Sequence, residues 1–119
     1  MGYTTQFQGT FKLNKKLTPK LQAQLIEFAN TRHGGNMDPF PNMPGFWCQW
    51  VPTSDGEGIE WDGNEKFYNY VEWLVYIIEN FLQPEEYILN GTVRYRGEDF
   101  NDCGDVICEN NKVTVNQLG

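Results

Sequence analysis

The stretch GFWCQWVPTSDGEGIEWDGNEK, residues 45–66, decides how the chain is divided. Its two ends, residues 46–51 and 58–61, favour strands, and the PTSDGEG segment between them is rich in turn-forming residues. The stretch is therefore predicted to be a β-hairpin. The alternation of its side chains predicts that the apolar face contributes to the core through Phe46, Cys48, Trp50, Ile59 and Trp61.

A helix is predicted on each side of this hairpin. The first runs from Thr18, a typical N-cap residue followed by proline, to about Arg32. The second runs from Asn64, as its N-cap, to about Gln83, where the next residue is proline. Between the first helix and the hairpin, HGGNMDPFPNMPG is predicted to be a loop, because its glycines and prolines interrupt regular structure.

Strands are predicted at both ends of the chain. Residues 3–13 alternate between apolar and polar side chains, and residues 88–96, 104–108 and 112–116 form three more strands. The sequence ENNK favours a tight turn between the last two, because asparagine tolerates positive φ. The order of elements predicts one α+β domain, residues 1–119, with two helices packed on an antiparallel sheet of about six strands.

Composition supports a single globular domain of 119 residues, with 39% hydrophobic residues. The sequence opens with no apolar leader and contains no apolar run of the length that crosses a bilayer, about 20 residues. Its three cysteines do not make a self-contained disulfide framework. We therefore expect a soluble protein of the cytoplasm, or of the host cytoplasm if a phage encodes it, without a membrane partner.

The net charge of −7 is distributed unevenly. Residues 1–37 hold five basic and one acidic residue, whereas residues 38–119 hold four basic and fifteen acidic ones. An acidic surface repels phosphate backbones, so direct nucleic-acid binding is disfavoured. A basic protein surface would instead be attracted and steered towards the chain.

Enzyme and metal chemistry have weak sequence support. The acids between Asp55 and Glu65 do not have the spacing of a calcium-binding EF-hand loop. Only one cysteine–histidine dyad is conceivable, Cys48 with His33, and Cys48 is predicted to lie on an apolar strand face. No catalytic residue, metal or cofactor is predicted. A carboxylate or metal-dependent enzyme built on the acidic hairpin stays the third hypothesis.

A partner-binding surface is better supported. Trp73 and Tyr76 fall on the polar side of the second predicted helix, beside Glu72 and Glu79. Aromatic side chains surrounded by carboxylates would suit a basic protein partner. The alternative is that the first helix or the loop after it covers both aromatics. The rest of the predicted partner-binding surface comes from the hairpin: Trp47, Glu60 and Asp62.

An alternative function uses basic residues. Arg94 and Arg96 alternate onto one strand face, and together with Arg32 they could line a small anionic pocket. With a stacking aromatic, such a pocket would capture a nucleotide signal. The other interpretation is that these arginines pair with neighbouring acids on a solvated sheet face.

Three stretches resemble a family of small uncharacterised proteins from bacterial and phage genomes: MGYTTQFQGTF, GFWCQWVPTSDGEGIEWDGNEKFYNYVEWL and LNGTVRYRGED. Longer members have additional sequence where this chain has only HGGNMDPFPNMP. The family has no established activity, so no functional residue is carried over. By analogy with small acidic proteins of mobile elements, the resemblance implies an anti-defence inhibitor, anti-CRISPR-like, that blocks a basic surface of a host protein.

Overall fold

The structure, a computed structural model, describes residues 3–34 and 43–118. Within them the elements are β1 (Gln6–Gln8), β2 (Phe11–Leu13), α1 (Pro19–Ala29), β3 (Trp50–Pro52), β4 (Gly58–Trp61), α2 (Tyr70–Ile77), η1 (Ile78–Leu82), η2 (Gln83–Glu85), β5 (Leu89–Arg96), β6 (Cys103–Glu109) and β7 (Lys112–Gln117). The α+β class is confirmed. The described part of the sheet has seven strands, one more than predicted.

All strand pairs in the sheet are antiparallel, in the order β3-β4-β2-β5-β6-β7, and β1 also pairs with β5. The additional strand arises because the predicted strand 3–13 is interrupted at Gly9, which has a φ of 116°. A Cβ at Gly9 would lie 3.1 Å from the Thr92 carbonyl oxygen. The interruption lets β2 lie between β4 and β5 while β1 stays on β5.

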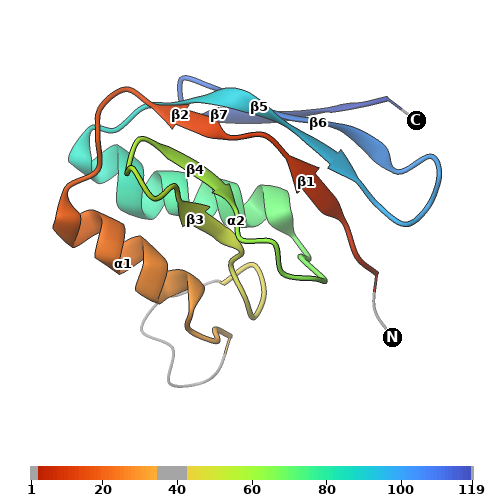
Figure 1. Ribbon diagram of the computed structural model, residues 1–119, viewed down its shortest axis with the longest axis horizontal. Helices are drawn as coiled ribbons and strands as arrows, with labels where there is room; N and C mark the ends of the chain where they lie inside the picture. The colour runs from red at the N-terminus through yellow and green to blue at the C-terminus, as the bar shows by residue number, and fades with distance from the viewer. Residues whose placement is uncertain (1–2, 35–42, 119) are drawn as a thin grey trace.

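The sheet curls around α2. This helix contacts both β3 and β7, the strands at the two ends of the sheet order, so it lies on the concave side. Figure 1 shows both helices below the β5–β6–β7 part of the sheet, with β3 and β4 in front of α2. α1 packs beside β3. Among the described residues, none of the helices has the length and apolar character needed to cross a membrane.

The second helix begins later than predicted. Asn64 is not its N-cap: Lys66 and Asn69 have φ values of 60° and 58°, which are incompatible with a continuous right-handed helix. The segment before the helix is held by a hydrogen bond of 2.9 Å from Gln49 Nε2 to the carbonyl oxygen of Glu65. The helix therefore starts only at Tyr70.

The end of the same helix widens into a π turn. The N–H of Gln83 donates to the carbonyl oxygen of Ile78, five residues earlier. Asn80 donates its side-chain Nδ2 to the carbonyl oxygen of Tyr76 at 2.9 Å. This side-chain bond satisfies a carbonyl at the point where the helix changes its hydrogen-bond spacing.

The central hairpin forms, but its first strand is shorter than predicted. It begins at Trp50 rather than at residue 46, and Phe46 is exposed instead of belonging to the core. Cys48, Trp50 and Ile59 are buried as predicted, and Trp61 is partly buried against the core. At the C-terminal hairpin, Asn110 and Asn111 both have positive φ, as predicted from ENNK.

Candidate functional site

Three segments that are distant in sequence meet at one end of the molecule. The Tyr3 hydroxyl donates to Asp102 Oδ2 at 2.7 Å and accepts a hydrogen bond from the Asp99 N–H at 2.9 Å. The Tyr3 N–H donates to the Tyr68 hydroxyl at 3.1 Å, and the Thr4 N–H donates to a Glu98 carboxylate oxygen. The start of the chain therefore ties the segment before α2 to the β5–β6 loop.

We call this region the acidic end and define it by Glu65, Glu98, Asp99, Asp102, Tyr68 and Phe100. A hollow of about 350 Å³ lies within it, lined by Glu65 and Glu98 together with Arg96, Thr4, Gln6 and Gly97. The carboxylates of Glu65, Glu98, Asp99 and Asp102 thus lie in the same region as one guanidinium, that of Arg96. The local balance is negative.

Tyr3 keeps its proton in this arrangement. The Asp99 N–H bond lowers the pKa of Tyr3, but desolvation together with the hydrogen bond to Asp102 outweighs it, so the pKa is raised. A neutral hydroxyl can donate to one acid segment and accept from the other at the same time. The tyrosine therefore holds the carboxylate-rich loop in place without adding another negative charge.

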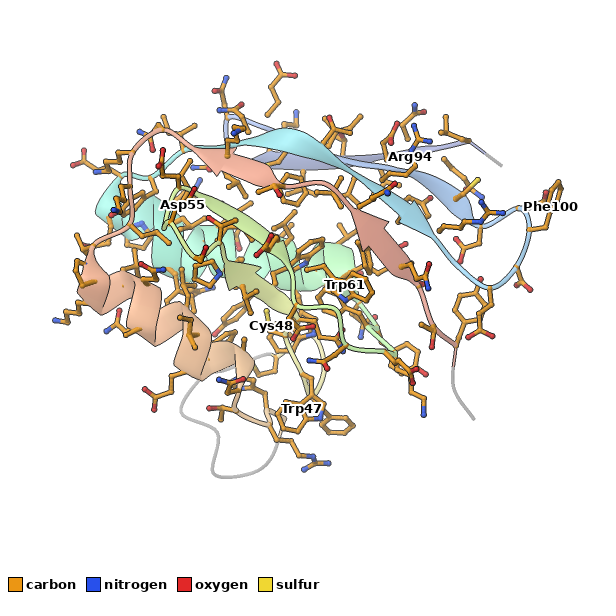
Figure 2. All side chains as sticks on the ribbon, viewed as in Figure 1. Trp47, Cys48, Asp55, Trp61, Arg94 and Phe100 are labelled. Carbon is orange, nitrogen blue, oxygen red and sulfur yellow. The ribbon has the colours of Figure 1, made fainter. Side chains whose placement is uncertain are left out.

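Phe100 is the most exposed large apolar side chain of the described residues, at 87%. It extends from the β5–β6 loop away from the rest of the molecule (Figure 2). Tyr68, on the neighbouring segment, is 51% exposed. The sequence interpretation missed both aromatics. The available signal was GEDFND, where Phe100 has acids on one side and polar residues on the other, so it has no apolar neighbour at strand or helix spacing.

The prediction that Trp73 is an exposed anchor on the second helix is wrong. Trp73 is fully buried, with its ring centroid 5.8 Å from Phe28 and 5.7 Å from His33 at the end of the first helix. Tyr76 is half-buried and stacks on Phe28 at 5.7 Å. The alternative that the first helix covers these aromatics is the correct one. Glu72 and Glu79 are exposed.

The hairpin residues of the predicted surface behave differently from one another. Trp47 is about half exposed, Asp62 is exposed and Glu60 is half-buried opposite Val51. Asp55 Oδ1 accepts hydrogen bonds from the Thr53 hydroxyl and the Glu57 N–H, which lower the pKa of Asp55. Asp55 therefore shapes the turn. Within the described ranges, no three potential ligands among His, Cys, Asp and Glu lie close enough to share a metal ion.

The three arginines do not form one pocket, contrary to the nucleotide-binding alternative. Arg32 lies over the Phe46 ring at 4.4 Å, at the end of α1. Arg94 pairs with Asp105 across neighbouring strands at 2.7 Å, and Arg96 lines the hollow of the acidic end. Figure 2 shows Arg94 far from Trp47, the neighbour of Phe46 in the chain. The ion pair of Arg94 with Asp105 agrees instead with the interpretation that these arginines pair with neighbouring acids on the sheet face.

A second, larger hollow of about 610 Å³ lies between α1 and η1. Phe28 and Phe81 contribute its apolar lining, and its charged lining consists of Lys20, Glu27 and Glu85. Because acids outnumber bases there, this hollow does not suit an anionic nucleotide either.

Cys48 and His33 lack the features of an activated pair. Burial raises the pKa of the Cys48 thiol to about 12, whereas a nucleophilic cysteine needs a lowered pKa. Its Sγ lies 3.7 Å from the Trp50 carbonyl oxygen. His33 is buried, with Nε2 2.9 Å from the Phe28 carbonyl oxygen. Cys48 therefore fits a packing role in the core, and His33 fits a role in holding the backbone at the end of the first helix.

Comparisons with protein-family models, with curated proteins and with solved structures found no match to this chain. What the acidic end can bind is therefore inferred from its own side chains. Exposed carboxylates attract a basic surface, and Phe100 supplies an apolar side chain that gains most when a partner covers it.

Proposed function

We propose that the protein is a non-enzymatic binding protein whose acidic end docks on a basic surface of a partner protein. The observation that carries this proposal is Phe100, which is 87% exposed between Glu98 and Asp99 on one side and Asp102 on the other. Burying such a side chain contributes about 1.5–3 kcal/mol. An exposed aromatic with a carboxylate rim has the composition of an interface anchor.

The charge identifies the kind of partner. Basic surfaces that bind nucleic acid are lined by lysine and arginine, and the carboxylates of the acidic end would stand in for phosphates. We propose a host protein that handles nucleic acid, such as a defence component. The resemblance to a family from bacterial and phage genomes supports an anti-defence inhibitor. Direct binding of DNA or RNA by this acidic chain is disfavoured.

The test is affinity capture from a bacterial lysate, followed by titration of the captured protein by interferometry at two salt concentrations. We expect Phe100→Ala to weaken binding at least about tenfold, because an aromatic anchor loses its buried area. Raising the salt from about 50 to 300 mM should weaken the wild-type complex at least about fivefold, since exposed charges are screened.

Phe46→Ala is the matched control, because Phe46 is an exposed aromatic whose ring lies against the Arg32 guanidinium. It should leave the affinity unchanged. Equal affinities for wild type and Phe100→Ala, or a complex insensitive to salt, would refute the proposal.

A further inference from the structure

β7 ends the sheet with an uncovered edge. It pairs with β6 on one side, and no described residue pairs with its other side. Val115 within the strand is 45% exposed, and Leu118 directly after it is 52% exposed. Such an edge presents unpaired backbone groups to solvent.

The register of the hairpin shows which backbone groups point outward. Asn110 and Asn111 form a two-residue turn, so Glu109 and Lys112 are a hydrogen-bonded pair. Bonded and non-bonded pairs then alternate, and the bond of 2.9 Å from the Leu118 N–H to the Cys103 carbonyl oxygen fits this alternation. The N–H and C=O groups of the intervening residues therefore face away from β6: Val113, Val115 and Gln117.

The two ends of the strand order, β3 and β7, differ in their protection. β3, at the other end, has three residues and includes Pro52, which cannot donate a hydrogen bond. β7 has six residues, no proline and a single charged residue, Lys112. Natural edge strands are commonly protected by proline, by charged side chains, especially lysine, or by a covering segment. Among the described residues, β7 has only Lys112, at its first position.

The charges around β7 are balanced locally. Asp105 on the neighbouring strand pairs with Arg94, and Glu109 faces Lys112 in the register of the hairpin. β7 itself has no acidic residue, although the whole chain has a net charge of −7. Two β7 edges can therefore meet without bringing carboxylates of the two copies face to face.

We propose that β7 pairs antiparallel with β7 of a second copy, about a two-fold axis through Val115. In this register Val115 faces its own counterpart and Val113 faces Gln117, so all three residues with outward backbone groups are paired. Lys112 would face Leu118, and no like charges would face each other. This inference does not rest on the proposed function, because Phe100 takes no part in it.

The test substitutes Val115, the residue on the proposed two-fold axis. Sedimentation at concentrations up to about 500 µM should show a reversible dimer of the wild type, since so small an interface binds weakly. Val115→Glu and Val115→Lys should each weaken association at least about tenfold, because two like charges meet. Mixing the two variants in equal amounts should restore the dimer, which also shows that both variants are folded.

Three results would overturn the inference: a monomeric wild type at the highest concentration, undiminished association of Val115→Glu, or a mixture that stays monomeric. At concentrations far below those at which the dimer forms, capture of a basic partner by Val115→Glu should equal that of the wild type, which keeps this test separate from that of the acidic end.

Discussion

Trp73 is fully buried against the end of the first helix, and among the described residues its Nε1–H has no hydrogen-bond acceptor. A buried donor without a partner costs about 1–3 kcal/mol. The large apolar contact of the indole with Phe28 and its surroundings opposes this cost. At this residue, packing and hydrogen bonding therefore act in opposite directions.

Substitutions at this position should separate the two contributions. Trp73→Ala should lower the free energy of unfolding by about 3–5 kcal/mol, because it leaves a cavity. Trp73→Phe should cost less than about 2 kcal/mol, since it removes an N–H that has no acceptor in the described part of the chain, together with part of the ring. Urea unfolding followed by circular dichroism measures both values.

Trp47→Phe is the control and should stay within about 0.5 kcal/mol of the wild type, because the Trp47 side chain is about half exposed. If Trp73→Phe proved as destabilising as Trp73→Ala, the account of an unpaired N–H would be wrong.

The acidic character of the candidate site could be predicted from the sequence, but its position and its exposed aromatic residue could not. The charge distribution indicated a surface rich in carboxylates, and helical periodicity placed Trp73 on it, but Trp73 is buried and Phe100 is the exposed aromatic. Helical periodicity assumes one buried stripe, whereas this helix is covered by the sheet and also by the first helix. Burial of a second side of the helix depends on tertiary packing, so no local sequence pattern could predict it.

At the scale of the elements, alternation predicted the regions that form strands, but not the break at Gly9 or the start of β3 at Trp50. The register between β2 and β4 depends on Gly58, because a Cβ there would lie 2.4 Å from the Phe11 carbonyl oxygen. The start of the second helix was not predictable from its capping residue, since Gln49 holds the preceding segment through a contact between distant parts of the chain.

Gly58→Ala should therefore lower the free energy of unfolding by about 1–3 kcal/mol, because the new methyl group forces β2 and β4 apart. Gly45→Ala is the matched control: its nearest neighbours would lie 3.5 Å away, so it should be nearly neutral. Thermal and urea unfolding of both variants measure the difference. A neutral Gly58→Ala would show that the two strands can separate without loss.

At the scale of the whole molecule, the two proposed surfaces combine. The acidic end lies beside the C-terminal end of β7, because Gly104 and Gln117 are partners there. Antiparallel pairing of two β7 strands would point the two acidic ends in opposite directions. Such a dimer could hold two partner molecules, or two sites of one partner, with increased avidity.

Global stability should depend on pH above neutrality. Burial raises the pKa of Cys48 to about 12 and that of Cys108 to about 11, while the unfolded thiols keep a value of 9.0. Above about pH 9 the unfolded chain releases these protons and the folded chain keeps them. The free energy of unfolding should then fall by up to about 1.4 kcal/mol per pH unit for Cys48.

Urea unfolding in reductant between pH 7 and about 10 tests this dependence. Cys48→Ala should flatten the decline above pH 9, even though it is less stable at every pH. Cys103→Ala should keep the full decline, because Cys103 is only half-buried. A slope unaffected by Cys48→Ala would contradict the assignment.

The pairing of the first strands with the fifth also sets an order of events during synthesis. Gln6 pairs with Arg96, and Leu13 pairs with Leu89, so β1 and β2 leave the ribosome long before β5, with which they pair, is made. Until then Phe7 has no strand partner, and Phe11 can pair only with Ile59 of β4. Contacts of such long sequence separation slow folding. Until they form, the aromatic side chains of these strands stay exposed in the nascent chain.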